Sequence, residues 1–166
     1  LKSFYMNSGF LDVEVSEPEL DASKPKKAVL TFNIVEGQRY RIGEISLSGM
    51  AELSEDVLRP TIRLRPGNIA SYENINLGSE GLRAYYGNRG YIRAAVRPEF
   101  DAHAENGTVD IEYAIAEGSV GYINKVNISG NERTQDKVIR REVVIYPDEI
   151  YNRSRVKTSE NRLQNL

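Results

Sequence analysis

The sequence has no cysteine and only one histidine among its 166 residues. The absence of cysteine excludes disulfide frameworks, thiolate metal ligands and cysteine nucleophiles. The single histidine, His103, stands in a polar connection between two predicted strands and has no second histidine to act with it. Because metal centres in proteins normally need three or four ligands, we expect neither a metal site nor a cofactor.

Long apolar runs are also missing from the sequence. No uninterrupted run approaches the roughly 20 residues that a bilayer-spanning helix needs, and the first residues lack the pattern of a signal peptide. The net charge is −2, from 22 basic and 24 acidic side chains. Proteins that bind nucleic acid generally need a basic surface to displace counterions, so this balance argues against a general nucleic-acid binder.

Recognisable catalytic motifs are missing as well. There is no Ser/His/Asp set, paired-carboxylate site, P-loop or dinucleotide fingerprint, so the sequence predicts a protein that is not an enzyme. The string Gly87-Asn88-Arg89-Gly90 matches the GxxG loop of KH nucleic-acid-binding domains. In KH domains that loop joins two helices, whereas here it joins a predicted helix to a predicted strand. A KH-like module remains the alternative, and we interpret Gly90 as a helix-capping glycine.

What the sequence does contain is an internal repeat. A shift of 81 positions superimposes a pattern of glycines, prolines and core-type apolar residues from end to end without a gap. A period of this length indicates an array of small domains. The aligned pairs include Glu36-Gly37 with Glu117-Gly118, Ser48-Gly49 with Ser129-Gly130, Pro66 with Pro147, Ile69 with Ile150, and Gly9-Phe10 with Gly90-Tyr91.

One complete copy of the repeat, which we call a module, is expected over residues 39–119. Its alternating and helical patterns occur in the order β-α-α-β-β. This order predicts an α+β fold in which two helices cover one face of a three-stranded mixed sheet. The expected elements are a strand over residues 41–48, a helix capped by Ser54, a helix capped by Ser71, and strands over residues 91–97 and 109–116.

Both flanks look like parts of the same module. Residues 1–38 match its second half, and residues 120–166 match its first half, beginning with a strand through Val126 and Ile128. The chain is therefore expected to be a segment of a longer array. Since each flank leaves an apolar face uncovered, we also expect head-to-tail self-association, in which residues 120–166 of one chain complete residues 1–38 of another.

Two motif stretches point to a known family. Tyr40–Gly49 reads YRIGEISLSG and Gly121–Asn131 reads GYINKVNISGN, and Tyr86–Tyr91 follows as Tyr-x-x-x-Gly-Tyr. With a hairpin that ends in Glu-Gly, this set resembles the POTRA domains of the BamA family of outer-membrane protein assembly factors. The resemblance identifies residues 1–38 as the second half of the third domain, residues 39–119 as the complete fourth, and residues 120–166 as the first half of the fifth.

The resemblance implies a non-enzymatic scaffold on the periplasmic face of the bacterial outer membrane. It implies that the scaffold binds unfolded outer-membrane proteins and passes them to a membrane-embedded barrel that is absent from this sequence. Nucleic acid is not an expected partner. A second alternative stays open, in which the array is a purely structural spacer. Such a spacer would set the distance over which the array extends and would make no contact with clients.

The second predicted strand of the complete module is the candidate client-binding element. If it lies at a sheet edge, its unpaired N–H and C=O groups could accept an extended client strand by β-augmentation. An ordinary edge strand protected by charged side chains is the alternative interpretation. The residues of this candidate edge are Tyr91, Ile92, Arg93, Ala94, Ala95, Val96 and Arg97.

A charged segment near the end of the chain is the candidate partner-binding patch. Arg140, Arg141 and Glu142 lie in a predicted helix. The resemblance implies that the corresponding segment contributes to contact with the lipoprotein BamD. The alternative is a solvated helix face with local ion pairs.

Overall fold

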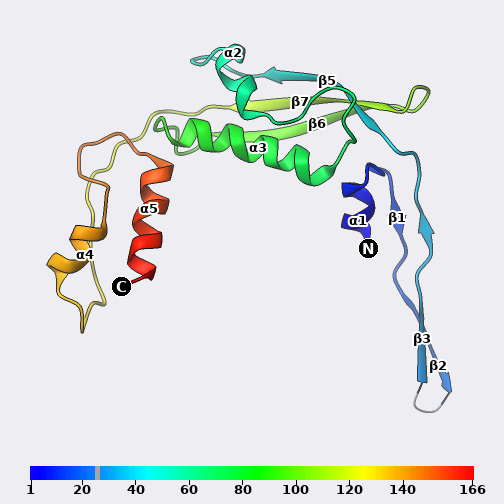
Figure 1. The fold of residues 1–166 in the computed structure, drawn as a ribbon, viewed down its shortest axis with the longest axis horizontal. Helices are drawn as coiled ribbons and strands as arrows, with labels where there is room; N and C mark the ends of the chain where they lie inside the picture. Colours follow the sequence, from blue (N-terminus) through cyan, green and yellow to red (C-terminus); the bar gives the residue numbers. More distant parts are fainter. Residues whose placement is uncertain (25–26) are drawn as a thin grey trace. The chain divides into compact units, whose positions relative to one another are not determined.

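The computed structural model describes residues 1–24 and 27–166 (Figure 1). The chain forms two compact units. The division passes through the predicted complete module, so several elements of that module begin in one unit and end in the other. The first unit consists of Leu1–Ser46, Arg63–Gly78 and Pro98–Tyr113, and the second of Leu47–Ile62, Ser79–Arg97 and Ala114–Leu166.

In the first unit, a short helix precedes an extended antiparallel hairpin. Pairing places Val15 opposite Ile34 and Leu20 opposite Leu30. Leu30 is 59% exposed and Phe32 is 43% exposed, so the hairpin presents apolar side chains to solvent. The elements are α1 (Lys2–Asn7), β1 (Glu14–Val15), β2 (Glu19–Lys24), β3 (Lys27–Thr31) and β4 (Ile34–Val35).

Three strands, β5 (Arg41–Ser48), β6 (Ala95–His103) and β7 (Thr108–Ala116), form a mixed sheet with the order β5-β7-β6. The central strand, β7, alternates strictly between buried and more exposed side chains. Such a period of two is typical of a strand with one covered face. The buried side chains of β7 are Val109, Ile111, Tyr113 and Ile115.

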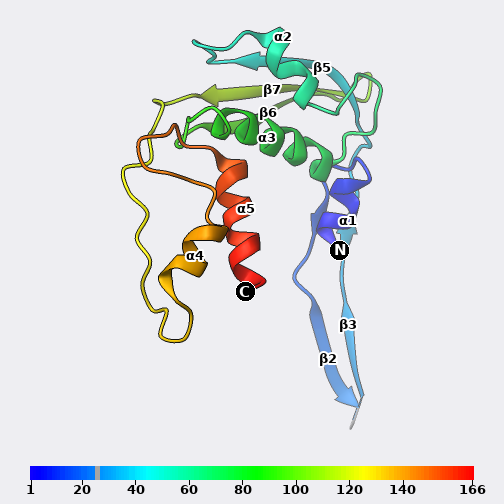
Figure 2. The same cartoon turned by 60° about the vertical axis from the view of Figure 1, so that its left-hand side comes forward.

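The helices of the complete module are α2 (Glu55–Leu58), continued by the 3-10 turn η1 (Arg59–Thr61), and α3 (Tyr72–Gly87). In both views α3 runs along the sheet (Figures 1 and 2). The two pack closely because Gly78 has no side chain: a Cβ there would clash with the Tyr113 hydroxyl, which donates to the Ile75 carbonyl (3.0 Å). The predicted α+β fold with a three-stranded mixed sheet is confirmed.

The predicted second strand was placed too early in the chain. Tyr91, Ile92, Arg93 and Ala94 form an isolated bridge and a turn, whereas Ala95, Val96 and Arg97 do begin β6, which continues to His103. Tyr91 is held by Val120 through the bridge and by Tyr86 through an edge-to-face ring contact of 5.4 Å. The Ile92-Ala94-Val96 alternation misled the prediction, because it continues without interruption from the turn into the strand.

The predicted strand stopped at Arg97, but β6 continues through Pro98. Proline lacks the N–H that a central strand needs, and it is tolerated where one side of the backbone is unpaired. Its position fits the place of β6 at the edge of the sheet.

Residues 120–166 form the helices α4 (Asp136–Glu142) and α5 (Arg153–Gln164). The strand predicted through Val126 and Ile128 is wrong for this chain: residues 123–130, all within the described part, take no strand conformation. A strand is stabilised by its ladder partners. In the complete module β7 pairs with β5, whereas no strand among the described residues pairs with residues 123–130.

No helix among the described residues combines the length and apolar character needed to cross a lipid bilayer.

Within the second unit, a buried carboxylate links three segments of the complete module. Glu117 is 7% exposed and accepts hydrogen bonds from the Tyr86 hydroxyl (2.8 Å) and the Glu52 N–H (3.1 Å). Burial acts to raise the pKa of Glu117, but these bonds, with those from the Ala51 and Leu53 backbone, outweigh burial and hold the pKa below its ordinary value. The carboxylate thereby ties the residue after β7 to α3 and to the loop after β5.

We expect Glu117→Ala to lower the free energy of unfolding by about 2–4 kcal/mol, because it leaves a buried hydroxyl and several N–H groups without an acceptor. Glu112→Ala is the matched control, since Glu112 is exposed on β7. A lowered folded-state pKa of Glu117 stabilises the fold at pH values above the unfolded-state pKa near 4.5, and this stabilisation is lost as the pH falls below 4.5 and through the folded-state pKa. Urea unfolding from pH 3 to pH 7 should therefore show a difference between Glu117→Ala and the parent chain that shrinks in acid. Equal stabilities of the two variants at pH 7 would contradict this role.

Candidate functional site

The edge strand β6 offers unpaired backbone to a partner. Within the part of the chain that the structure describes, β6 pairs with β7 and with no further strand. Ala95 and Arg97 are exposed and Val96 is buried, so the start of β6 alternates as a strand should. Arg97 and, further along, Glu99 and Asp101 place charges on this strand, and such charges discourage unselective strand pairing.

The opposite edge of the sheet is partly covered. In the first unit, the Ile42 N–H donates to the Asn68 carbonyl (2.8 Å), and the Gly67 N–H donates to the Ile42 carbonyl (2.7 Å). Ile69 also forms a bridge with Arg41. The start of β5 is therefore already engaged, and β6 is the more open edge.

The first four residues of the predicted client edge lie elsewhere, at a junction between modules. Tyr91 bridges to Val120, and the side chain of Ile92 packs so closely on Gly121 that a Cβ there would clash with it. The structure thus separates the predicted set: three residues lie on the open edge, and four belong to the junction.

The same junction occurs twice, 81 residues apart. In the first unit, the Tyr40 N–H donates to the Gly9 carbonyl (2.8 Å), and in the second the Gly121 N–H donates to the Gly90 carbonyl (2.8 Å). We call these contacts, with the turn and helix start that follow each, joint 1 and joint 2. Joint 1 joins residues 7–9 to residues 40 and 67–73, and joint 2 joins residues 88–90 to residues 121 and 148–154.

Both joints require a glycine at the end of a helix. Gly9 and Gly90 each have φ of +98°, which side chains other than glycine rarely adopt. A Cβ would also lie 2.9 Å from Ile69 Cγ2 in joint 1 and 2.6 Å from Ile150 Cγ2 in joint 2. The glycines of the KH-like GxxG string therefore contact neighbouring residues of this chain. Gly90 caps the C-terminal end of α3, as the sequence predicted.

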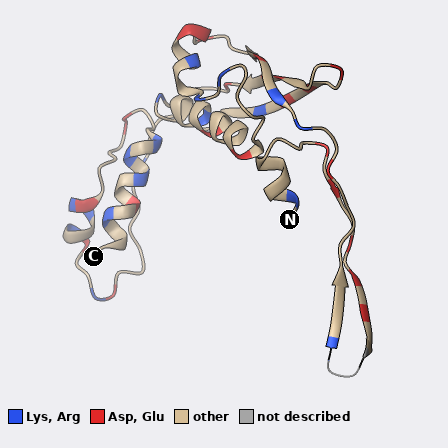
Figure 3. Ribbon diagram, turned by 45° about the vertical axis from the view of Figure 1, so that its right-hand side comes forward, with Lys and Arg blue, Asp and Glu red and all other residues tan. Residues whose placement is uncertain are grey.

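The charged patch lies on α4, where Figure 3 shows both signs of charge. Arg140 Nε pairs with Asp136 Oδ2 (2.6 Å), and Arg141 Nε pairs with Glu142 Oε1 (3.1 Å). The Arg141 side chain is 73% exposed. Ion pairs at such exposure contribute little to stability and exchange readily for other partners, so the patch fits both a solvated face and a docking surface.

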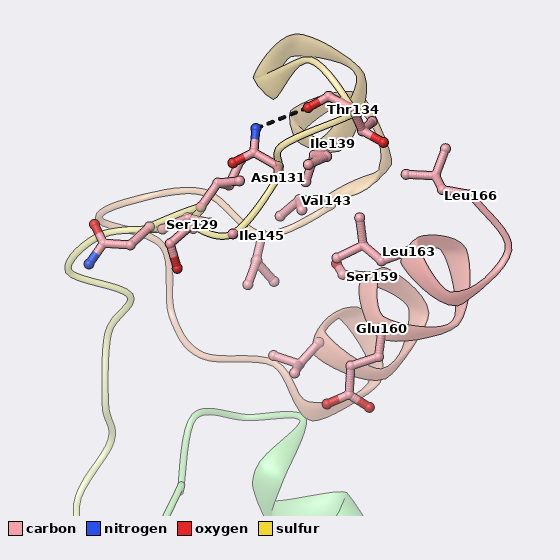
Figure 4. A pocket seen from close by; sticks show the side chains of 15 residues that line it. Ser129, Asn131, Thr134, Ile139, Val143, Ile145, Ser159, Glu160, Leu163 and Leu166 are labelled. Atoms are coloured by element: carbon pink, nitrogen blue, oxygen red, sulfur yellow. Dashed lines mark hydrogen bonds between the residues drawn. The ribbon is translucent and has the colours of Figure 1, made fainter.

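An apolar groove of about 680 Å³ lies between residues 126–131 and the helices α4 and α5 (Figure 4). Figure 4 shows Ile139, Val143, Ile145 and Leu163 along it. Shifted by one repeat, its apolar lining coincides with buried core residues of the complete module, so the groove is an uncovered half of a core. The pairs are Ile128 with Leu47, Ile139 with Leu58, Val143 with Ile62, Ile145 with Leu64, Val156 with Ile75, and Leu163 with Leu82.

The single histidine has a local partner. His103 Nε2 lies 3.0 Å from Asp110 Oδ2, and this hydrogen bond raises the pKa of His103. Asp110 also accepts the Glu44 N–H, which lowers the pKa of Asp110. Among the described residues, no three His, Asp or Glu side chains gather in a way that could hold a metal ion. The contacts of His103 link one end of β6 to β7.

Two functionally relevant features were missed from the sequence. The Glu-Gly repeat marked Glu117 without revealing that it is buried, and the repeated Asn7 and Asn88 were not singled out. Glu117 and the two asparagines lie at matched positions of the repeat, and this recurrence was the signal that could have identified them. Their partners lie 31 to 66 residues away along the chain, which no local pattern reveals.

Comparison with known proteins gives a family. The POTRA family model, described as "Surface antigen variable number repeat", matches residues 40–118 and 121–166. The outer membrane protein assembly factor BamA of Neorickettsia risticii is 33% identical over 167 residues, covering 100% of this chain and 22% of that protein. BamA of Neisseria meningitidis is 27% identical, covering 98% of this chain and 21% of that protein. The chain thus spans about a fifth of the length of these relatives.

Solved structures share the fold. The crystal structure of Haemophilus influenzae BamA POTRA3-5 superimposes with a TM-score of 0.88 at 22% identity, covering 99% of this chain and 65% of that one. BamA from Haemophilus ducreyi lacking POTRA domains 1-3 gives a TM-score of 0.65 at 23% identity, covering 76% of this chain and 24% of that one. The resemblance drawn from the motif stretches is confirmed. The chain belongs to the POTRA family, and along its whole length it matches BamA assembly factors.

Proposed function

We propose that this chain is part of a periplasmic scaffold of an outer-membrane protein assembly factor and that it has no enzymatic activity. The observation that carries the proposal is the 33% identity to a BamA assembly factor over the entire chain. The repeated module, with its repeated joints, supports it. Such a scaffold acts by presenting backbone edges and charged faces at fixed spacing.

We propose that β6 receives unfolded outer-membrane proteins by β-augmentation, with Ala95, Val96 and Arg97 at the point of entry. Backbone pairing tolerates many client side chains, which suits clients that share strand propensity and no single motif. The unpaired edge of β6 and the partly covered edge of β5 support this choice. The charges that follow Arg97 limit pairing to clients that accommodate them.

A crosslinking experiment tests the client site. The natural chain has no cysteine, so Ala95→Cys on β6 and Glu112→Cys on the central strand β7 each provide a single thiol. A peptide with the sequence of one outer-membrane barrel strand and one cysteine should form a disulfide with Ala95→Cys and not with Glu112→Cys. Amide exchange in β6 should slow when the peptide is added.

The competing functions give different results. A structural spacer crosslinks at neither position. A KH-like module binds single-stranded RNA with a strong dependence on salt, whereas the scaffold should bind oligouridine negligibly at any salt concentration.

We propose that the charged patch on α4 binds an accessory lipoprotein of the BamD type. Arg141 is the most exposed member of the patch and, among the described residues, pairs only with its sequence neighbour, Glu142. An oppositely charged partner can therefore replace that pair at low cost.

Charge reversal tests the partner patch. Arg141→Glu should weaken binding to a purified BamD-type lipoprotein by roughly tenfold, with the difference shrinking at high salt. Lys157→Glu is the matched control, because Lys157 is an exposed cation on α5 with a local acidic partner, Glu160. Equal affinities of the two variants, measured by calorimetry, would mean that the patch is a solvated helix face.

We propose that the apolar groove also accepts the hairpin of a second copy of this chain. The hairpin corresponds by the repeat to β6 and β7 of the complete module, and the groove corresponds to the core that β7 covers. Leu30 falls on Ile111, which is fully buried, and its neighbour Val29 falls on the acidic Asp110. The hairpin face that carries Leu30 and Phe32 therefore matches the groove.

Sedimentation over a range of concentrations tests this association. Leu30→Asp should abolish the concentration-dependent increase in mass, because it places a charge against the groove. Val29→Asp should leave that increase intact, because adjacent strand residues face opposite sides. A parent chain that stays monomeric at every concentration, or two variants that behave alike, would refute the proposal.

A further inference from the structure

We propose that Asn7 and Asn88 are positioning residues of the two joints: each completes the N-terminal cap of a helix in the following module and so fixes the direction of that module. The inference concerns the geometry of the array and does not depend on any client or partner.

Each recipient helix has a cap of its own and a second one from upstream. At the start of α3, Ser71 Oγ accepts the Asn74 N–H (3.4 Å), and Asn7 Oδ1 accepts the Glu73 N–H (3.0 Å). A helix leaves its first four N–H groups without partners in the helix, and side-chain oxygens commonly satisfy them. The cap of α3 is therefore shared between two modules.

The start of α5 repeats this arrangement. Asn152 Oδ1 accepts the Arg155 N–H (3.0 Å), and Asn88 Oδ1 accepts the Ser154 N–H (2.9 Å). In both joints the local cap binds the third helical residue and the upstream asparagine binds the second. The same pair of capping hydrogen bonds occurs twice, one repeat apart, so it is a regular feature of the joint.

Both asparagines are held in place by the end of a helix. Asn7 is the last residue of α1, and the Asn88 N–H donates to the Ala84 carbonyl (2.9 Å) at the end of α3. Two residues later, the carbonyl of Gly9 or Gly90 accepts the second contact of the joint. Each joint thus has at least one side-chain attachment and one backbone attachment, and separate attachments resist rotation that a single one would permit.

The two joints differ in one chemical detail. Asn7 also donates through Nδ2 to the Glu73 carboxylate (3.2 Å), whereas Asn88 Oδ1 also accepts the Ser154 hydroxyl (2.9 Å). An aspartate at position 88 still accepts both Ser154 groups and places a negative charge at a helix N-terminus, where it is favourable. An aspartate at position 7 loses its donor and faces the Glu73 carboxylate.

Spin-label distance measurements on the cysteine-free chain test the proposal. Labels at Glu80 and Asn161 span joint 2, and labels at Ser3 and Glu112 span joint 1; all four residues are exposed. Asn88→Ala should broaden the joint 2 distance distribution, and Asn88→Asp should keep it narrow. Asn7→Asp should broaden the joint 1 distribution as Asn7→Ala does. Asn74→Ala, at an exposed asparagine of α3, is the matched control and should change neither.

Amide exchange gives the second readout. Asn88→Ala should speed exchange of the Ser154 amide roughly five- to tenfold, the size expected for loss of one helix cap, while amides of β7 keep their rates. If Asn88→Ala leaves both readouts unchanged, the backbone attachment suffices and the proposal is wrong. If exchange in β7 rises as much as at Ser154, the side chain merely stabilises the fold, and the proposal is also wrong. Identical behaviour of the two aspartate variants would overturn it too.

Discussion

The module depends on β7 covering the apolar face of its helices. In the complete module, Ile111, Tyr113 and Ile115 of β7 are buried, and so are the facing residues of α2 and α3. In residues 120–166 the same apolar positions exist without such a strand, and they line an open groove. A small domain buries proportionately little surface, so the loss of one strand exposes a large share of its core. The closed core of the complete module and the open groove of residues 120–166 both follow from whether that strand is present.

Much of this architecture could be predicted from the sequence because it depends on local periodicity. The repeat of 81 residues, the order of elements and the buried stripes of β5, β7 and α3 follow from apolar residues at periods of 2 and 3.6. Glycines that close turns and helices were also identified correctly, since a positive φ restricts the choice of residue. Gly90 is one example, with φ of +98°.

The errors in the predicted elements arise where a residue's conformation is set by contacts with residues that are distant in the sequence. Ile92 and Ala94 continue the alternation of β6, yet they lie in a turn because Tyr91 is committed to Tyr86 and Val120. Val126 and Ile128 have strand character, but no strand in the described part of the chain pairs with them. Of the candidate site residues, Ala95, Val96 and Arg97 lie on the edge and Arg140 and Arg141 lie exposed on a helix. The partners proposed for them are surfaces outside the chain, which periodicity does not encode.

The direction of the shared caps has a consequence for folding. Each asparagine precedes in the chain the helix that it caps, so a chain that folds from its N-terminal side has the acceptor in place before the recipient helix forms. If the asparagines act as proposed, each module is oriented by the module before it, in chain order.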